Sequence, residues 1–260
     1  MSFIGDALNA ARRSKKRIIN TRLVDVSRLH EVEERRTLDK IFTKLTVVGV
    51  LDIGANKGSF ARNALKAMPT RIPVVCVEPN ATVIEPFRAK HVTDDTITVL
   101  HVAVSGSDAV EEFHITVNDE FSSLKMPNAE VGDFGDKVQI KDTIKIETLS
   151  LDSLIAQAFP KGVGADLLVK LDTQGMDFSI LDGSGSVGRR ACCIITEVEF
   201  SDLYGSGKNW IEHVEMVCAK GFELASIYPS NPGHFPKLHD LNAVFVNRAC
   251  LRGTVDALAV

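Results

Sequence analysis

Short runs of β-branched and other apolar residues alternate with longer amphipathic segments from about residue 47 to residue 247. The runs are apolar on both faces, as are the strands in the middle of a parallel sheet, and the segments between them have helical length and periodicity. This order predicts an α/β fold with a doubly wound, mostly parallel seven-stranded sheet whose last strand is antiparallel. The predicted strands are 47–53, 74–78, 97–104, 166–172, 191–197, 222–228 and 243–247.

Two further segments, 112–117 and 138–148, alternate polar with apolar residues. A period of two predicts antiparallel strands with one face in solvent, so we expect a hairpin at an edge of the sheet. The loop between them, residues 118–137, is rich in turn formers and long enough to act as a lid over a site. Ser150 or Asp152 is expected to cap the helix that follows, because their side-chain oxygens accept hydrogen bonds from first-turn amides.

Residues 1–45 differ from the rest of the chain because basic residues cluster at positions 12–17 beside apolar positions. We therefore divide the chain into an N-terminal helical extension, residues 1–45, and one α/β domain, residues 46–260. A basic amphipathic helix can pack on the core with its charged face in solvent. It can also lie on an anionic membrane surface, or contact a partner such as a second copy of the chain in a homodimer.

The charge balance argues against a general nucleic-acid binder. With Lys+Arg 30 against Asp+Glu 34, the chain has a formal charge of -4 and no overall positive field to attract a phosphate backbone. Its 5 cysteines are an odd number without a C-x-x-C pair, which indicates reduced thiols. No apolar stretch is long enough to span a membrane and the N-terminus lacks the apolar block of a secretory signal, so we expect a cytoplasmic protein.

The turn after the first predicted strand carries the first candidate binding residues, Asp52, Gly54, Asn56 and Gly58. Glycine tolerates a positive φ and lets the backbone approach a ligand closely, and amides at a helix start favour a polar or anionic ligand. The spacing G-x-x-x-G lacks the middle glycine that makes room for pyrophosphate in G-x-G-x-x-G dinucleotide sites. The turn therefore favours a nucleoside without phosphates over NAD, and Asp52 offers an acceptor for a cationic amino group.

Glu78 ends the second predicted strand, 20 residues after Gly58. A carboxylate at this position can accept hydrogen bonds from both hydroxyls of a ribose. Because the carboxyl ends of parallel strands meet at one edge of the sheet, the glycine turn and this acid together indicate a nucleoside site at that edge.

Charged side chains at the ends of two later strands indicate catalysis. Lys170 and Asp172 alternate with apolar residues as their strand reaches the same edge, so their side chains share a face. Glu197 ends the next strand. We expect Asp172 to be the general base, with Glu197 as the second candidate, and Lys170 to neutralise Asp172.

Substrate contacts are expected from two loops. Ser122 and Ser123 lie in the first loop and can hydrogen-bond a substrate or close over the site, although serines in such loops also cap local turns. His234 and His239 lie in the proline-containing loop before the last strand, where either can help as a base. The histidines do not have metal-ligand spacing, and we predict no metal site. The alternative is a divalent ion held by Asp172 and Glu197, since hard oxygen ligands suit magnesium.

Taken together, these residues resemble the FkbM-type branch of the class I S-adenosylmethionine-dependent methyltransferases. The motifs appear in the family's order between residues 47 and 204, with one departure at Asp177, where the family usually has glutamate. The matching residues are Asp52-Ile53-Gly54-Ala55-Asn56-Lys57-Gly58-Ser59-Phe60, Val77-Glu78-Pro79-Asn80, Ala103-Val104-Ser105, Ser122-Ser123, Leu151-Asp152-Ser153-Leu154, Lys170-Leu171-Asp172-Thr173-Gln174-Gly175-Met176-Asp177 and Glu197-Val198-Glu199-Phe200.

The resemblance implies a Rossmann-like class I methyltransferase fold, with S-adenosyl-L-methionine as methyl donor. It implies that Asp172 faces the methyl group and an acceptor that is a hydroxyl of a sugar, glycan or secondary metabolite. It also implies contacts to the methionine and ribose portion from Asp52, Gly54, Asn56 and Gly58, to the ribose hydroxyls from Glu78, and to adenine from Ala103 and Val104.

Other functions stay open at this point. An amine acceptor would need less help from a base than a hydroxyl acceptor does. An NAD-dependent oxidoreductase on a similar sheet would bind nicotinamide cofactor, against which the absent G-x-G-x-x-G counts. A non-catalytic nucleoside-binding interaction module, using residues 1–45 to bind a partner, would bind its ligand without turnover.

Overall fold

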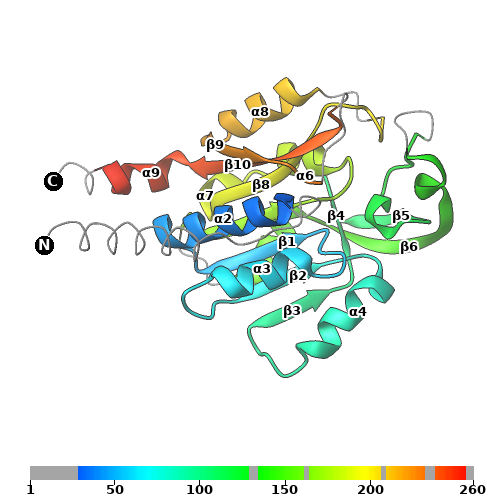
Figure 1. Cartoon of the computed structure of the whole chain (residues 1–260), viewed down its shortest axis with the longest axis horizontal. Helices are drawn as coiled ribbons and strands as arrows, with labels where there is room; N and C mark the ends of the chain where they lie inside the picture. Colours follow the sequence, from blue (N-terminus) through cyan, green and yellow to red (C-terminus); the bar gives the residue numbers. More distant parts are fainter. Residues whose placement is uncertain (1–28, 129–133, 161–163, 206–208, 232–237, 256–260) are drawn as a thin grey trace, which may run out of the picture.

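The computed structural model describes residues 29–128, 134–160, 164–205, 209–231 and 238–255. Its centre is a seven-stranded sheet in the order β3-β2-β1-β7-β8-β10-β9 (Figure 1). Neighbouring strands are parallel, except that β10 is antiparallel to both β8 and β9. The predicted doubly wound sheet with an antiparallel last strand is confirmed. Its strands are β1 Gly49–Ile53, β2 Val74–Val77, β3 Ile97–Leu100, β7 Leu167–Leu171, β8 Ala191–Glu199, β9 Phe222–Tyr228 and β10 Asp240–Asn247.

The run 97–104, predicted as one buried central strand, is two short strands in different sheets. β3 forms an edge of the large sheet and is mostly half-buried, whereas β4, Ala103–Ser105, pairs with β6 in a second sheet. The prediction was wrong because a continuous apolar run does not reveal a change of partner. Ala103 and Val104 are 3% exposed in the second sheet, as well buried as residues of a central strand would be.

The second sheet has three strands in the order β4-β6-β5. β5, Ala109–Thr116, and β6, Ile140–Ser150, form the predicted antiparallel pair. They lie in this separate sheet, at the right of Figure 1, and not at an edge of the large sheet as expected. The described parts of the segment between them include the short helices η2 Asp119–Phe121 and η3 Gly135–Val138.

Helices cover both faces of the large sheet, as a doubly wound fold requires. Apolar residues of α5–α8 pack on one face, and those of α2–α4, together with α9, pack on the other. The helices are α2 Leu29–Lys44, α3 Ser59–Ala67, α4 Ala81–Lys90, α5 Leu151–Ala158, α6 Asp177–Gly183, α7 Val187–Arg190, α8 Trp210–Ala219 and α9 Arg248–Val255.

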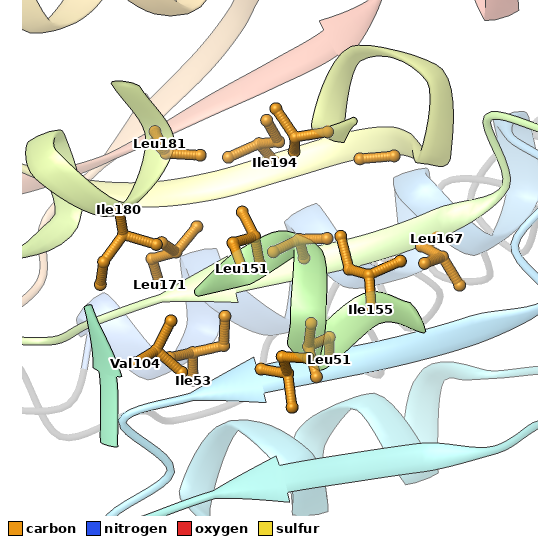
Figure 2. Close-up of a cluster of buried hydrophobic side chains, with 14 of the residues drawn as sticks. Leu51, Ile53, Val104, Leu151, Ile155, Leu167, Leu171, Ile180, Leu181 and Ile194 are labelled. Carbon is orange, nitrogen blue, oxygen red and sulfur yellow. The ribbon is translucent and has the colours of Figure 1, made fainter. Parts of the chain in front are cut away.

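Successive side chains of each strand point to opposite faces of the large sheet, and this divides the hydrophobic core into two clusters. Figure 2 shows the first part, in which Leu51 and Ile53 of β1 lie beside side chains of β7, β8, α5 and α6. Val50 of β1 points the other way and belongs to a second cluster with residues of α2, α3 and α4. Asp52 has the same parity as Val50, so the second face is the one whose carboxyl end carries polar side chains.

The predicted N-terminal extension is described from residue 29 onward, where it forms α2. Leu38 is fully buried and Ile41 is 5% exposed, and both pack in the second core. The basic cluster at positions 12–17 lies outside the described residues, so the expected membrane or partner contact stays a prediction. No helix among the described residues is long and apolar enough to cross a membrane.

The two candidate caps of α5 have different roles. Ser150 is the N-cap, and its hydroxyl accepts a hydrogen bond from the backbone N–H of Ser153 at 3.2 Å. Asp152 instead accepts hydrogen bonds from the turn between α6 and α7. Its donors are the hydroxyls of Ser184 and Ser186 (2.7 Å for Ser186) and the amides of Gly185 at 3.0 Å and Ser186 at 3.2 Å.

We expect Asp152→Ala to lower the free energy of unfolding by about 2–3 kcal/mol, because it leaves these donors without their charged acceptor. Ser150→Ala removes a single cap and should cost about 1 kcal/mol. Urea unfolding of both variants and the native chain measures the difference. Equal losses would contradict the larger role of Asp152.

Candidate active site

The candidate site lies at the carboxyl ends of the central strands. Asp52, Lys170 and Glu197 each follow, two positions on, an apolar residue of the second core. Side chains two apart on a strand point to the same face, so all three point to the side covered by α2 and α3. The same parity holds for Glu78, just beyond the end of β2, and the sheet therefore gathers these predicted residues along one edge.

The glycine turn after β1 is built around a close backbone approach. Gly54 has φ +76°, and a Cβ placed on it would lie 1.9 Å from the backbone oxygen of Asp172. Gly58 has φ +71°, and a Cβ there would lie 2.5 Å from the Phe87 ring. Asn56 also has a positive φ, of 44°. The predicted need for glycine is confirmed, although the close neighbours that enforce it belong to this protein and not to a ligand.

Glu78 is 5% exposed and is held by two backbone amides. Its Oε2 accepts from the N–H of Asn56 at 2.8 Å, and its Oε1 accepts from the N–H of Asn80 at 2.8 Å. Burial raises the pKa of Glu78 to about 7 despite these two hydrogen bonds. The acid thus ties the end of β2 to the turn after β1, and each oxygen keeps a lone pair for a further donor.

Asp52 is 1% exposed, and its Oδ2 accepts from the N–H of Ala61 in α3 at 3.2 Å. Burial raises its pKa to about 7, with the charge of Lys170 acting in the opposite direction. The ionised form of a buried carboxyl group is stabilised when a cation or a set of hydrogen-bond donors binds beside it.

Lys170 and Asp172 form the predicted ion pair, with Nζ and Oδ2 3.0 Å apart. The Lys170 side chain is 4% exposed, whereas that of Asp172 is 39% exposed. Burial alone would raise the pKa of Asp172, but the ammonium of Lys170 holds it below its ordinary value. Burial likewise opposes the charge on Lys170, and the carboxylates of Asp172 and Asp52 keep its pKa above the ordinary value.

Gln174 is a site residue that the sequence reasoning did not single out. Its Nε2 donates to Asp172 Oδ1 and to Glu197 Oε2, each at 3.0 Å, and its Oε1 accepts from the hydroxyl of Tyr204 at 2.9 Å. It has a positive φ of 52° and precedes Gly175, which has φ 88°. That glycine, three residues after the strand-end acid Asp172, is the signal from which a tight turn could have been predicted.

Glu197 lies beside this bridge and is half-buried. Burial and the negative charges of Asp172 and Asp240 raise its pKa well above the ordinary value. Its backbone N–H donates to Asp177 Oδ2 at 3.0 Å, and Asp177 also accepts from the amide of Thr173 at 2.8 Å. Asp177, the acid that departs from the family pattern, thus accepts hydrogen bonds on both of its carboxylate oxygens. These bonds fix the two strand ends that carry Asp172 and Glu197.

The predicted substrate residues are not all brought together. Ser122 lines the site cavity, and its hydroxyl accepts from the N–H of Thr116 at 3.1 Å. Ser123 is 1% exposed and donates to the backbone oxygen of Gln174 at 2.7 Å, so it holds the loop against the site. His239 lies outside the cavity lining, with Nδ1 3.0 Å from the Ser201 hydroxyl. His234 lies outside the described residues.

A cavity of about 810 Å³ runs along this edge and is within the size range of small-molecule sites. Ala103 and Val104 line it from β4, as predicted for a flat apolar contact. Other lining residues were not predicted: Glu34 comes from α2, and Asn242 comes from β10. Within the described ranges, no three His, Cys, Asp or Glu side chains are grouped as a metal site would need.

Residues 52–224 match the family described as the methyltransferase FkbM domain. The match covers more than half of the chain, and the chain belongs to this family. The 2-O-methyltransferase NoeI of Sinorhizobium fredii (strain NBRC 101917 / NGR234) is 26% identical over 162 residues. The aligned part is 60% of this chain and 65% of that protein, so it spans less than two thirds of the relative.

Solved structures of several methyltransferases are similar at low sequence identity. Precorrin-6y C5,15-methyltransferase of Geobacter metallireducens GS-15 has a TM-score of 0.41 and 14% identity, over 82% of this chain and 87% of that one. Aeropyrum pernix fibrillarin, in complex with S-adenosyl-L-methionine, has a TM-score of 0.42 and 9% identity, over 83% of this chain and 74% of that one.

The family match confirms the predicted FkbM-type methyltransferase with S-adenosyl-L-methionine as its cofactor, and it does not favour the oxidoreductase alternative. The strand order confirms the predicted Rossmann-like sheet. The carboxylates of the site fit this cofactor. Among described residues, Asp52 and Glu78 accept only backbone N–H groups, which leaves lone pairs for an ammonium group and for ribose hydroxyls. A positively charged ligand also suits a pair of buried acids whose pKa values are raised.

We expect Gly54→Ala to lower the free energy of unfolding by about 3 kcal/mol or more, because the new Cβ meets a backbone oxygen and the φ is positive. Gly106→Ala is the control, since a Cβ there meets nothing within 4 Å and its φ is not positive. Thermal unfolding of both variants checks this. A Gly54→Ala protein as stable as the control would show that the turn does not need glycine.

Proposed function

We propose that this chain transfers the methyl group of S-adenosyl-L-methionine to a hydroxyl of a small molecule or glycan, of the sugar or secondary-metabolite class. The observation that carries the proposal is the pair Asp172 and Glu197. Gln174 bridges the two carboxyl groups at 3.0 Å each, and their pKa values are displaced in opposite directions. Such pairs divide the work of proton transfer. The similarity to a protein named a 2-O-methyltransferase supports oxygen as the accepting atom.

In this proposal the glycine turn and the two buried acids hold the cofactor. Asp52 accepts from its ammonium group and Glu78 from its ribose hydroxyls, while Ala103 and Val104 contact adenine through backbone and apolar surface. The turn residues Gly54, Asn56 and Gly58 shape the space for the methionine and ribose portion. The support for these roles is that Asp52, Gly54, Asn56 and Glu78 line one cavity with Ala103 and Val104.

When bound, S-adenosyl-L-methionine supplies an electrophilic methyl group on a positively charged sulfonium. A hydroxyl loses its proton as its oxygen is methylated, and S-adenosylhomocysteine leaves. A carboxylate with a raised pKa is a stronger base than an ordinary one, which suits Glu197 to take this proton. Asp172, kept ionised by Lys170, orients the hydroxyl. We therefore assign the role of general base to Glu197, the second candidate from the sequence, and not to Asp172.

The setting of the reaction follows from the same features. A net acidic chain with an acid-lined cavity suits a small-molecule or glycan acceptor and not a nucleic acid. All 5 cysteines are described and free, which supports a reducing compartment such as the cytoplasm. A homodimer or membrane contact through residues 1–45 remains our expectation for the extension.

Cofactor binding should tighten as the pH rises from 6 to 8. Burial raises the pKa of Glu78 and Asp52 to about 7 in the free protein, and both must be ionised to accept from the cofactor. Each group whose pKa falls on binding therefore contributes about tenfold in affinity over this range. Calorimetry with S-adenosylhomocysteine at several pH values measures it, and Glu78→Gln should flatten the profile. A pH-independent affinity in the native chain would contradict the two roles.

The catalytic assignment predicts a loss of turnover without a loss of cofactor. We expect Glu197→Gln to lower kcat about 10²-fold or more, since general-base catalysis supplies about 10²–10⁴-fold. Asp172→Asn should also lower kcat, because the hydroxyl loses the carboxylate that orients it. S-adenosylhomocysteine formation is followed with a panel of methyl glycosides and simple alcohols as acceptors. Cofactor affinity is measured beside it and should stay within about threefold of the native value, because neither residue is assigned to hold the cofactor.

Glu223→Gln is the matched control, because Glu223 is an exposed acid on β9 that pairs with Arg248 on the surface. It should leave turnover unchanged. Turnover that survives in both site variants would overturn the assignment of the base. Cofactor binding without turnover on any acceptor would favour the non-catalytic module.

A further inference from the structure

One wall of the cavity comes from parts of the chain outside the matched residues 52–224. It contains Asp240 and Asn242 of β10, and His30 and Glu34 of α2. β10 runs antiparallel between β8 and β9, so its first residues lie at the same edge as the last residues of β8. The β10 part of this wall therefore lies beside Glu197.

Asn242 of β10 is a residue of this wall with a buried polar atom that lacks a partner among the described residues. It is 5% exposed, it lines the cavity, and its Oδ1 has no hydrogen-bond partner among the described residues. Asn247, five residues further along β10, is 4% exposed and is fully engaged. Its Nδ2 donates to the backbone oxygens of Gly188 at 2.8 Å and Ala191 at 2.9 Å.

The sheet register places Asn242 directly opposite Glu197 on one side and Tyr228 on the other. Side chains opposite one another on antiparallel strands have Cβ atoms about 4.5–5.5 Å apart, so the amide lies next to the carboxyl group. The hydroxyl of Tyr228 is also buried without a partner among the described residues. An unmatched buried amide costs free energy that a ligand can recover.

We propose that Asn242 determines acceptor specificity by hydrogen-bonding a second polar group of the acceptor, next to the hydroxyl that Glu197 deprotonates. The inference rests on the proposed function and adds to it a class of acceptor: a molecule with two neighbouring polar groups, such as a 1,2-diol. An amide suits this task because it carries both a donor and an acceptor, and a half-turn of the side-chain amide exchanges them. An acceptor with a single hydroxyl leaves the amide unmatched and binds less well.

The first test needs no acceptor. If Asn242 is unmatched in the free protein, Asn242→Leu removes that cost and should raise Tm by about 2 °C or more. Asn247→Leu is the matched control on the same strand and should lower Tm, because it leaves two backbone oxygens unpaired. A lower Tm for Asn242→Leu, or an unchanged one, would show that Asn242 is a structural residue and would overturn the proposal.

The second test measures specificity with two probes that differ by one hydroxyl, trans-1,2-cyclohexanediol and cyclohexanol. Saturation-transfer NMR on the protein saturated with S-adenosylhomocysteine gives the affinity for each. The native chain should prefer the diol about tenfold or more, and Asn242→Leu and Asn242→Ala should lose that preference. No binding of the diol to the native chain, or an equal preference in the variants, would contradict the role.

The cofactor measurement separates this inference from the function on which it rests. A native chain that does not bind S-adenosylhomocysteine overturns both. A chain that binds it, and whose Asn242→Leu variant binds it equally well but keeps the preference for the diol, overturns the specificity role alone. Tight cofactor binding with loss of the preference supports both.

Discussion

The ammonium of Lys170 is the charge around which the carboxyl edge of the sheet is organised. The Lys170 side chain is buried, and a buried cation is stable only beside negative charges. The carboxylates of Asp172 and Asp52 supply the two most strongly interacting of these charges. One ammonium does not satisfy every acid at this edge. Asp172, in direct contact, keeps a low pKa, while Glu78 and Glu197 keep raised values. The edge is thus built with more acid than fixed base, which is the electrostatic condition for a positively charged cofactor.

The backbone around this charge has little freedom. Gly54 packs against the backbone oxygen of Asp172, so the turn after β1 and the end of β7 hold one another in place. Beyond Asp172 the chain turns at Gln174. The side-chain Nε2 of Gln174 donates to Glu197, and its side-chain Oε1 accepts from the hydroxyl of Tyr204. The cofactor turn and the acid–base pair are therefore parts of one packed unit.

Strand parity explains why a site can form at the end of a well-packed sheet. On one face, residues such as Leu51 and Ile53 stay apolar to the end of β1 and support α5 and α6. On the other face, the apolar residues stop one step earlier and acids or Lys170 take the last position. The family match spans the strands that supply most of these acids. The wall from α2 and β10 lies outside the family match, and its Asn242 lies beside Glu197 of the acid–base pair.

The sequence by itself determined the order of strands and helices, the antiparallel last strand, the glycine turn, and the strand-end residues Asp52, Glu78, Lys170 and Asp172. These follow from local periodicity and from the rule that carboxyl ends of parallel strands share an edge, so no knowledge of packing is needed. Only the tertiary structure decided that the run 97–104 divides between two sheets, because an apolar run does not indicate which strand each of its residues pairs with. It also decided which polar groups meet. Gln174 and Asn242 are ordinary amides in the sequence. Hydrogen bonds between distant strands make Gln174 a bridge, and the Oδ1 of Asn242 is left without a partner among the described residues.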